Sequence, residues 1–192
     1  MRGHLWPPRL MQLSDRVQEE FELFAAMNVV SLGELFGGKI CAALDRQHPR
    51  DLFDVHLLLE NEGITDEIRL GFIAALVSHS RPINEMLRPH FQDQRASFDK
   101  QFAGMARLSF TYEAYEETRE RLLAEIHASL TASERAFLVS FKEGKPDWKL
   151  LPLPKLPNMP AVQWKLLNIH RLIVRNPEKH KEILKALEET LA

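Results

Sequence analysis

Residues 31–59, SLGELFGGKICAALDRQHPRDLFDVHLLL, constrain the fold more than any other stretch, because they predict two helices joined by a tight turn. From Leu32 to Gln47 the apolar residues recur at helical spacing and collect on one face, namely Leu32, Leu35, Phe36, Ile40 and Ala43. His48 and Pro49 can then start a second helix, with His48 at the cap and Pro49 at the first helical position. The second helix is therefore expected to fold back on the first.

Charged side chains lie along the apolar sides of both predicted helices. Lys39 falls near the middle of the first face, and Arg46 lies two turns further on. A lysine in such a position either extends its ammonium group out to water along a buried stem, or turns inward to meet an anion. On the second helix Asp51 and Asp54 stand three residues apart and share one face. We expect the corner between the helices to bring these ionic groups close together.

The composition limits the classes of protein to which the chain can belong. Its 192 residues are 45% hydrophobic and 27% charged, which is typical of soluble globular proteins. A formal net charge of -2 provides no overall attraction for nucleic acid, so any such contact requires a local basic patch. The single cysteine, Cys41, excludes an intrachain disulfide. There is no bilayer-length apolar run and no hydrophobic signal core, so we expect no membrane association and a cytoplasmic location.

The rest of the chain also predicts helices, and the expected fold class is mainly α, a multi-helix bundle. Helical spacing, caps and breakers predict further helices over residues 12–27, 65–80, 83–87, 95–103, 111–130, 131–143, 161–174 and 177–191. Thr65 and Thr111 are expected caps, Thr131 opens a capping box, and Gly63 is expected to end the helix that Pro49 starts. Residues 1–11 are expected to form an irregular or extended lead-in. Residues 145–160 contain five prolines and are expected to be an extended segment that packs Trp148 and its leucines across a helical surface.

The motif GELFGGKICAALDRQHPRDLFDV resembles the second half of the nucleotidyltransferase core in the AbiEii/AbiGii family, the toxins of type IV toxin-antitoxin and phage-abortive systems. In that family a helix with a Glu and a Lys precedes a segment of the form R-x-x-x-R-D-x-x-D. The stretches NEGITDEIR, RPINEML and AVQWKLLNIH are also similar to the helical C-terminal part of such proteins. The resemblance implies that residues 1–60 are a remnant of the nucleotidyltransferase core and that residues 61–192 are a helical C-terminal domain.

The same resemblance implies a reaction, the transfer of a nucleotidyl group from an NTP to an acceptor such as tRNA. Mg²⁺ and an NTP are expected for the complete family enzyme. The motif positions carry implied roles, catalytic for Lys39, Asp51 and Asp54, and substrate-binding for Glu34, Arg46 and Arg50. Lys39 would contact the phosphates, a task that suits a compact charge on a long stem.

Part of the family pattern does not occur in this sequence. Family members carry, upstream, a Gly-Gly or Gly-Ser turn followed by a D-x-D or D-x-E pair on a strand, and these carboxylates hold the metal. The residues before the Lys39 helix contain neither feature. We therefore expect the C-terminal portion of such an enzyme, from a truncated or split gene, with no metal site of its own and no activity alone. The expected partners are a separately encoded N-terminal half, an antitoxin, tRNA or a second copy of the chain.

A purely structural interpretation of the motif stays open. Asp51 in the first turn of a helix is favoured by the backbone dipole alone, by ~0.3–1 kcal/mol. Asp54 can pair with Arg50 four residues earlier, and Lys39 can bridge to either carboxylate. The same residues would then form an ion-pair latch between two helices.

A second alternative is a non-catalytic helical module that binds an antitoxin, the missing half or RNA. The sequence that favours RNA is a group of basic and aromatic residues in the predicted helix over 161–174 and just after it. These residues are Trp164, Lys165, His170, Arg171 and Arg175.

Overall fold

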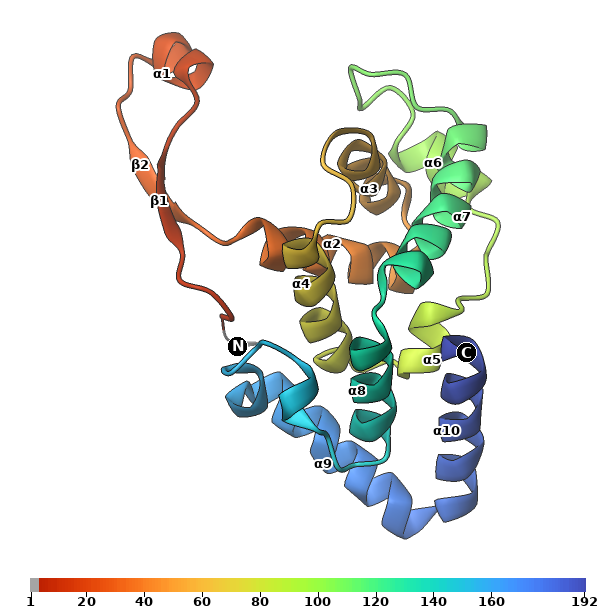
Figure 1. Ribbon diagram of the computed structural model, residues 1–192. Coiled ribbons are helices and arrows are strands. Elements are labelled where there is room, and N and C mark those ends of the chain that lie inside the picture. The colour runs from red at the N-terminus through yellow and green to blue at the C-terminus, as the bar shows by residue number, and fades with distance from the viewer. Residues whose placement is uncertain (1–3) are drawn as a thin grey trace.

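The computed structural model describes residues 4–192, most of which lie in α-helices (Figure 1), and so confirms the mainly helical fold. None of the described helices combines the length and the apolar character that crossing a membrane requires. The helices are α1 Asp15–Phe21, α2 Leu32–Arg46, α3 Pro49–Asn61, α4 Asp66–Val77, α5 Ile83–Leu87, α6 Arg95–Gln101, α7 Tyr112–Ser129, α8 Ala132–Lys142, α9 Pro160–Arg175 and α10 Pro177–Leu191.

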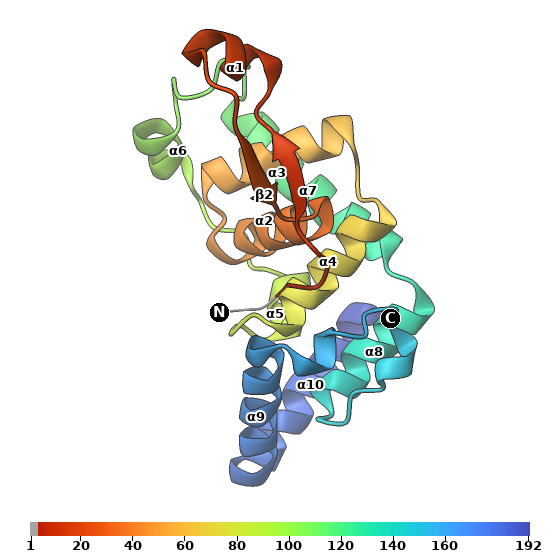
Figure 2. The ribbon, with the colours of Figure 1, turned by 90° about the vertical axis from the view of Figure 1, so that its left-hand side faces the viewer.

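Residues 9–29 form an arm that projects from the helical body (Figures 1 and 2). Strand β1, Arg9–Gln12, pairs antiparallel with β2, Ala26–Val29, and α1 lies at the tip between them. Of the predicted helix over 12–27, only α1 is helical, with Ser14 at its N-cap as expected, and the residues at both ends of the range belong to the strands and connecting segments of the arm. The predicted lead-in is extended in β1 from Arg9 on, and its residues 1–3 lie outside the described residues. Because α1 buries no side chain, no packing extends it, and it ends at Glu22 in a left-handed conformation.

The corner between α2 and α3 is built as the sequence predicts. Gln47 ends α2 with a left-handed backbone, φ 52°, and Pro49 occupies the first turn of α3. The ring of His48 caps α3 by accepting the backbone N–H of Arg50 at 3.2 Å. The hydroxyl of Tyr115 on α7 donates to the carbonyl of Gln47 at 2.7 Å, and so ties the corner to the body.

Helices α2 and α4 approach until their backbones touch. A Cβ placed on Gly37 would lie 2.3 Å from the carbonyl carbon of Gly71, and one placed on Gly71 would lie 1.9 Å from the carbonyl oxygen of Gly33. We call Gly33, Gly37 and Gly71 the glycine seam. Only residues without a side chain permit this approach, so the seam fixes the position of α2 on the body.

The glycine seam rotates α2 away from the orientation that its large apolar residues predict. Leu32 and Leu35 are 52% and 37% exposed, which contradicts their assignment to the buried face, whereas Ile40 and Ala43 are buried as expected. The buried residues of α2 are Gly33, Gly37, Ile40, Cys41, Ala43 and Leu44. A face defined by hydrophobicity alone therefore misses the positions where two backbones meet.

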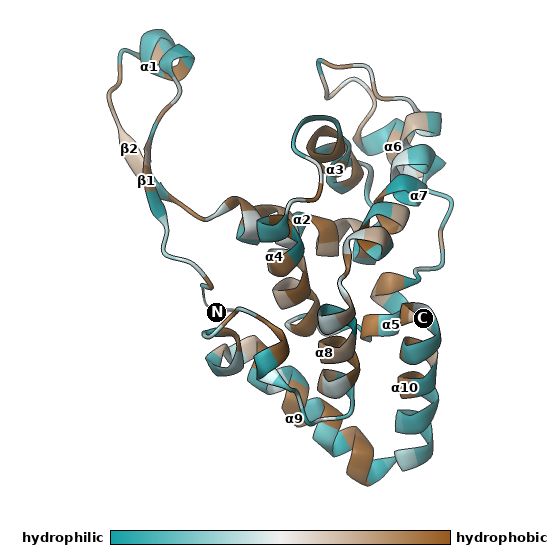
Figure 3. Cartoon of the chain, in the orientation of Figure 1, coloured by the Kyte–Doolittle hydropathy of each residue, from teal (hydrophilic) through white to brown (hydrophobic). Residues whose placement is uncertain are grey.

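The core of the body lies between helices that begin and end at the predicted caps. Thr65 and Thr111 cap α4 and α7, Thr131 opens α8 in a capping box, and Gly63 adopts φ +68° after α3. Helix α4 is strongly apolar in Figure 3, in keeping with its position inside the body. The largest fully buried side chains are Tyr115, Phe72, Phe137 and Phe141.

The proline-rich segment over 145–160 packs on α8 but is not extended throughout. It contains two short 3₁₀ helices, η1 Trp148–Leu150 and η2 Leu156–Asn158. The ring of Trp148 lies 5.6 Å from that of Phe137, centre to centre, which confirms the predicted packing across a helical surface. The buried leucines of the segment are Leu151, Leu153 and Leu156.

Candidate functional site

Lys39 on α2 and Asp54 on α3 form an ion pair across the corner. The ammonium Nζ of Lys39 donates to Oδ2 of Asp54. The two side chains are 33% and 41% exposed, so the pair lies at the surface where the two helices meet. Lys39 thus turns towards an anion, and Asp54 pairs with Lys39 in place of Arg50. An ion pair with this exposure contributes only about 0.2–1 kcal/mol to stability.

A second ion pair spans the turn itself. Nη2 of Arg46, at the end of α2, lies 2.8 Å from Oδ1 of Asp51 in the first turn of α3. The side chain of Asp51 is largely buried, and its other oxygen, Oδ2, has no hydrogen-bond partner among the described residues. Oδ2 is shielded from water, so it lacks the hydrogen-bond donor that a buried carboxylate oxygen normally has.

The residues at the turn surround a cavity of about 280 Å³. Nε2 of His48 lies 3.0 Å from Oε1 of Gln101, and Arg50 donates to the carbonyl of Gln101 at 3.3 Å, so α6 supports the rim. The sequence indicated His48 only as a helix cap. The residues that line the cavity are Arg46, His48, Arg50 and Asp51. We call these four together with Lys39 and Asp54 the corner site.

Glu34 belongs to a different part of the molecule. Five residues separate it from Lys39, which turns it about 140° around the helix. Its Oε1 accepts the backbone N–H of Leu5 at 2.9 Å and lies 3.6 Å from Nδ1 of His4. The structure thus brings five of the six sequence-predicted site residues to the α2–α3 corner, and places Glu34 beneath the segment that leads to the arm.

The described residues do not fit a bound Mg²⁺. Within residues 4–192 no three His, Cys, Asp or Glu side chains are arranged to hold a metal ion. One oxygen of Asp51 and one of Asp54 are already paired with cations.

Lys165, which the sequence groups with basic and aromatic residues suited to RNA, does not lie on a basic surface. Its side chain is buried, and Nζ donates to the carbonyls of Leu76 at 3.0 Å and Arg81 at 2.9 Å. Burial lowers the pKa of Lys165 to about 7. Trp164 beside it is 61% exposed, and the guanidinium of Arg171 lies 5.8 Å from its ring centre.

The comparison with protein families finds a match over most of the chain. The family described as "Nucleotidyl transferase AbiEii toxin, Type IV TA system" matches residues 1–168. No curated protein and no solved structure matches the chain. The matched range includes the arm, α2, α3 and the whole corner site. The chain belongs to the AbiEii nucleotidyltransferase toxin family of type IV toxin-antitoxin systems.

Proposed function

We propose that the corner site binds the phosphates of a nucleoside triphosphate, in a nucleotidyl transfer whose metal-binding carboxylates come from a D-x-D-bearing segment that residues 1–192 do not contain. The observation that carries the proposal is the contact between Lys39 and Asp54. It holds an ammonium group at a half-exposed position, where an incoming phosphate can replace the carboxylate as its partner. Membership of the family supports the class of reaction.

The charges at the corner suit a polyanion. Three cations, Lys39, Arg46 and Arg50, come from the two helices that meet there, and two of them line the cavity at the turn. A guanidinium can bind phosphate oxygens through two parallel hydrogen bonds, while an ammonium acts as a point charge. In the proposed complex, Lys39 contacts the phosphates, and Arg46 and Arg50 contact the leaving pyrophosphate or the backbone of an acceptor RNA.

Asp51 is the carboxylate best suited to orient the attacking hydroxyl of the acceptor substrate. Its side chain lines the cavity at the turn, its Oδ1 is held by Arg46, and its buried Oδ2 has no partner among the described residues. A carboxylate with one oxygen fixed and one unpaired can accept the hydrogen bond of an attacking hydroxyl and orient it. Asp54, in contrast, positions Lys39 before the nucleotide binds.

The test is calorimetric titration of residues 1–192 with each of the four NTPs, with and without Mg²⁺. We expect weak binding that does not require Mg²⁺ and that Lys39→Ala abolishes, because the cations bind the phosphates and the carboxylate pair is supplied elsewhere. Lys181→Ala is the matched control, since Lys181 is an exposed lysine that pairs with Glu178 on α10. Tight binding that requires Mg²⁺ and is lost in Lys39→Ala would contradict the proposed incompleteness.

Transfer itself is tested by adding the missing part. The DNA upstream of the codon for Met1 can be examined for a reading frame that encodes a G-[GS] turn and a D-x-D pair. Co-expression of such a segment is expected to produce Lys39-dependent transfer of label from an NTP to tRNA. If the co-expressed segment binds the chain and no NTP gives transfer, the proposal is wrong.

A second candidate function is a non-catalytic binding module, and the arm favours it. Both strands of the arm are exposed along almost their whole length, and so are many of its large apolar side chains. These side chains are Leu10, Met11, Val17, Phe21, Leu23, Phe24 and Met27. Such a surface is typical of a binding site for another polypeptide, either the missing half or an antitoxin. NTP titrations that show no binding, together with capture of a partner by the arm, would favour this function.

A further inference from the structure

A small cavity lies beneath the segment that leads into the arm, on the face of α2 that carries Glu34. Its volume is about 120 Å³. It is bounded by α2, by α4, by the N-terminal segment and by the end of the proline-rich segment. The lining residues are Leu5, Glu34, Gly38, Gly71, Ala74, Ala75, Ser78 and Met159.

Among the described residues of this lining Glu34 is the only charged one, and its carboxylate is only half satisfied. Oε1 accepts the N–H of Leu5, while Oε2 is shielded from water and has no hydrogen-bond partner among the described residues. A buried oxygen of this kind destabilises the protein until a donor reaches it. His4, the other titratable group in contact, is mostly exposed and faces Oε1.

The hydroxyl of Ser78, the other polar side-chain group in the lining, can also accept a hydrogen bond. The hydroxyl of Ser78 donates its own hydrogen to the carbonyl of Ala74 at 2.6 Å, so only its lone pairs remain available. An occupant must therefore bring N–H groups and positive charge, and it must tolerate the apolar walls that Leu5 and Met159 form.

The size of the cavity sets the length of the occupant. A cavity of about 150 Å³ holds benzene, so the 120 Å³ here accepts the end of a chain and excludes a whole nucleotide. Space remains at Gly38 in particular, since a Cβ placed there would meet nothing within 4 Å. Ala74 and Ala75 contribute small side chains to the wall that α4 forms.

We infer that this cavity is a binding site for a guanidinium or primary ammonium head group, which donates hydrogen bonds to Oε2 of Glu34 and Oγ of Ser78. The head group belongs either to a free small cation or to an arginine or lysine side chain of another polypeptide. The site is separate from the corner site, because its residues lie on another face of α2 and its charge has the opposite sign.

The test is a titration of the ¹⁵N-labelled chain, followed by NMR, with methylguanidinium as the probe and methylurea as its uncharged counterpart of the same shape. We expect methylguanidinium to shift the amides of Gly38, Gly71 and Ala75 in a saturable way, and methylurea to bind at least tenfold more weakly. An acetylated arginine dipeptide and its citrulline analogue form the second arm. Tighter binding of the arginine peptide than of methylguanidinium identifies a polypeptide side chain as the source, and equal binding identifies a free cation.

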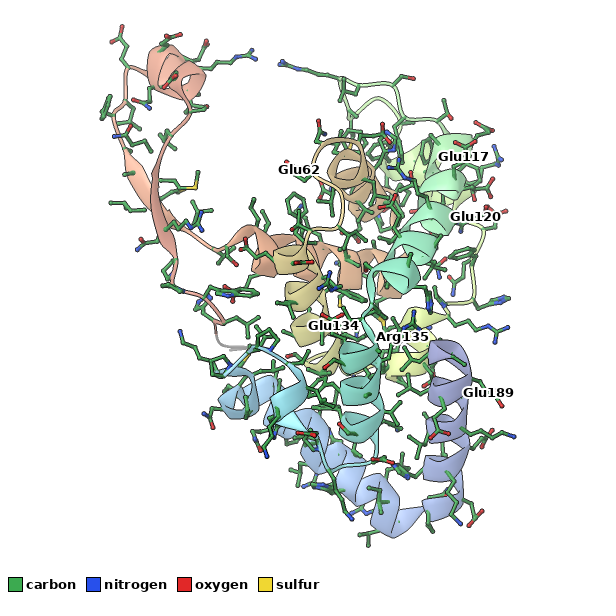
Figure 4. The ribbon with its side chains drawn as sticks, viewed as in Figure 1. Glu62, Glu117, Glu120, Glu134, Arg135 and Glu189 are labelled. Atoms are coloured by element: carbon green, nitrogen blue, oxygen red, sulfur yellow. The ribbon has the colours of Figure 1, made fainter. Side chains whose placement is uncertain are left out.

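Two variants and two controls connect the binding to the cavity. Glu34→Gln removes the charge and keeps the shape, and Gly38→Leu fills the open space, so each is expected to weaken methylguanidinium binding at least tenfold. Glu62→Gln changes an exposed carboxylate at the end of α3 (Figure 4) and should leave the affinity unchanged. Lys39→Ala should also leave it unchanged, which separates failure here from failure of the proposed NTP binding.

Three results would overturn the inference. They are shifts that rise linearly without saturation, equal affinity of Glu34→Gln and the parent chain, and a crystal grown with methylguanidinium in which Oε2 of Glu34 contacts only an ordered water.

Discussion

Gly37 on α2 lies against Gly71 on α4 with no room for a methyl group between the two backbones. Gly71→Ala would place a Cβ 1.9 Å from the carbonyl oxygen of Gly33, which backbone atoms cannot avoid by a change of rotamer. We expect the free energy of unfolding to fall by about 3 kcal/mol, at the upper end of the usual effect of overpacking. Urea denaturation followed by circular dichroism measures it.

The control for this prediction is the neighbouring glycine on α2. Gly38→Ala adds the same methyl group where nothing lies within 4 Å, and alanine favours a helix over glycine by about 1 kcal/mol. This variant should be slightly more stable than the parent chain. Equal losses of stability in both variants would show that the seam is not closely packed.

Glu134→Gln should destabilise the protein strongly. Glu134 is almost fully buried at the start of α8 (Figure 4). Its two carboxylate oxygens accept the Nε–H of Arg69, at 2.9 and 3.0 Å. Oε2 also accepts the backbone N–H of Thr131 at 2.8 Å. The amide weakens all of these interactions, so we expect a loss of about 3 kcal/mol in the free energy of unfolding. Glu189→Gln on the exposed face of α10 should change it by less than about 0.5 kcal/mol. Thermal denaturation of both variants measures the difference in stability. Similar melting temperatures for the two variants would contradict the prediction.

Stability should rise with pH between about 7 and 10 because of Lys165. The pKa of Lys165 falls to about 7 in the folded chain through burial, while the unfolded lysine keeps its ordinary pKa. In this interval the unfolded state binds one more proton than the folded state, so this group contributes a gain of up to about 1.4 kcal/mol per pH unit. Below pH 7 both states are protonated and the full penalty of burying the charge remains.

The measurement is the difference between the parent chain and Lys165→Met, taken from denaturation curves at several pH values. Met cannot titrate, so the upward slope due to Lys165 should be absent from the variant. Met also leaves the carbonyls of Leu76 and Arg81 without this donor, which shifts the variant's curve downward at every pH. Parallel curves from pH 7 to 10 would exclude the lowered pKa.

The ion pair between Lys39 and Asp54 should contribute little to stability. A double-mutant cycle with Lys39→Met and Asp54→Asn is expected to give a coupling energy of about 0.2–1 kcal/mol, because both side chains are partly exposed. The coupling should decrease further in high salt. A coupling above about 2 kcal/mol would indicate a latch whose main role is structural.

The parts of the fold that could be predicted from the sequence are those that depend on neighbouring residues. His48 and Pro49, the capping box at Thr131, and Gly63 each determine the backbone within one turn, and all three appear where expected. The arm could not be predicted in this way. Its strands are held by a ladder that joins Arg9 to Val29, twenty residues apart, and local helical spacing carries no information on such pairing.

The candidate site could likewise be predicted only where it depends on residues close in the sequence. Lys39 and Asp54 meet because each lies at the right spacing beside the predicted corner. Glu34 shares the motif but not the location, since it lies about 140° around α2 from Lys39 and its Oε1 accepts the N–H of Leu5. The division of the chain at residue 60 stays a prediction, although α2 on one side of it packs most extensively on α4 on the other.

The arm has a practical consequence for anyone who handles this protein in solution. In the described part of the chain β1 and β2 pair only with each other, so each strand has one edge whose main-chain donors and acceptors are unused. The exposed side chains of Leu10 and Phe24 add apolar surface to the same region, and this surface favours association between chains. Concentrated samples of residues 1–192 are therefore expected to oligomerise edge to edge or to precipitate. Preparations kept dilute, or supplied with a capping strand, should stay monodisperse.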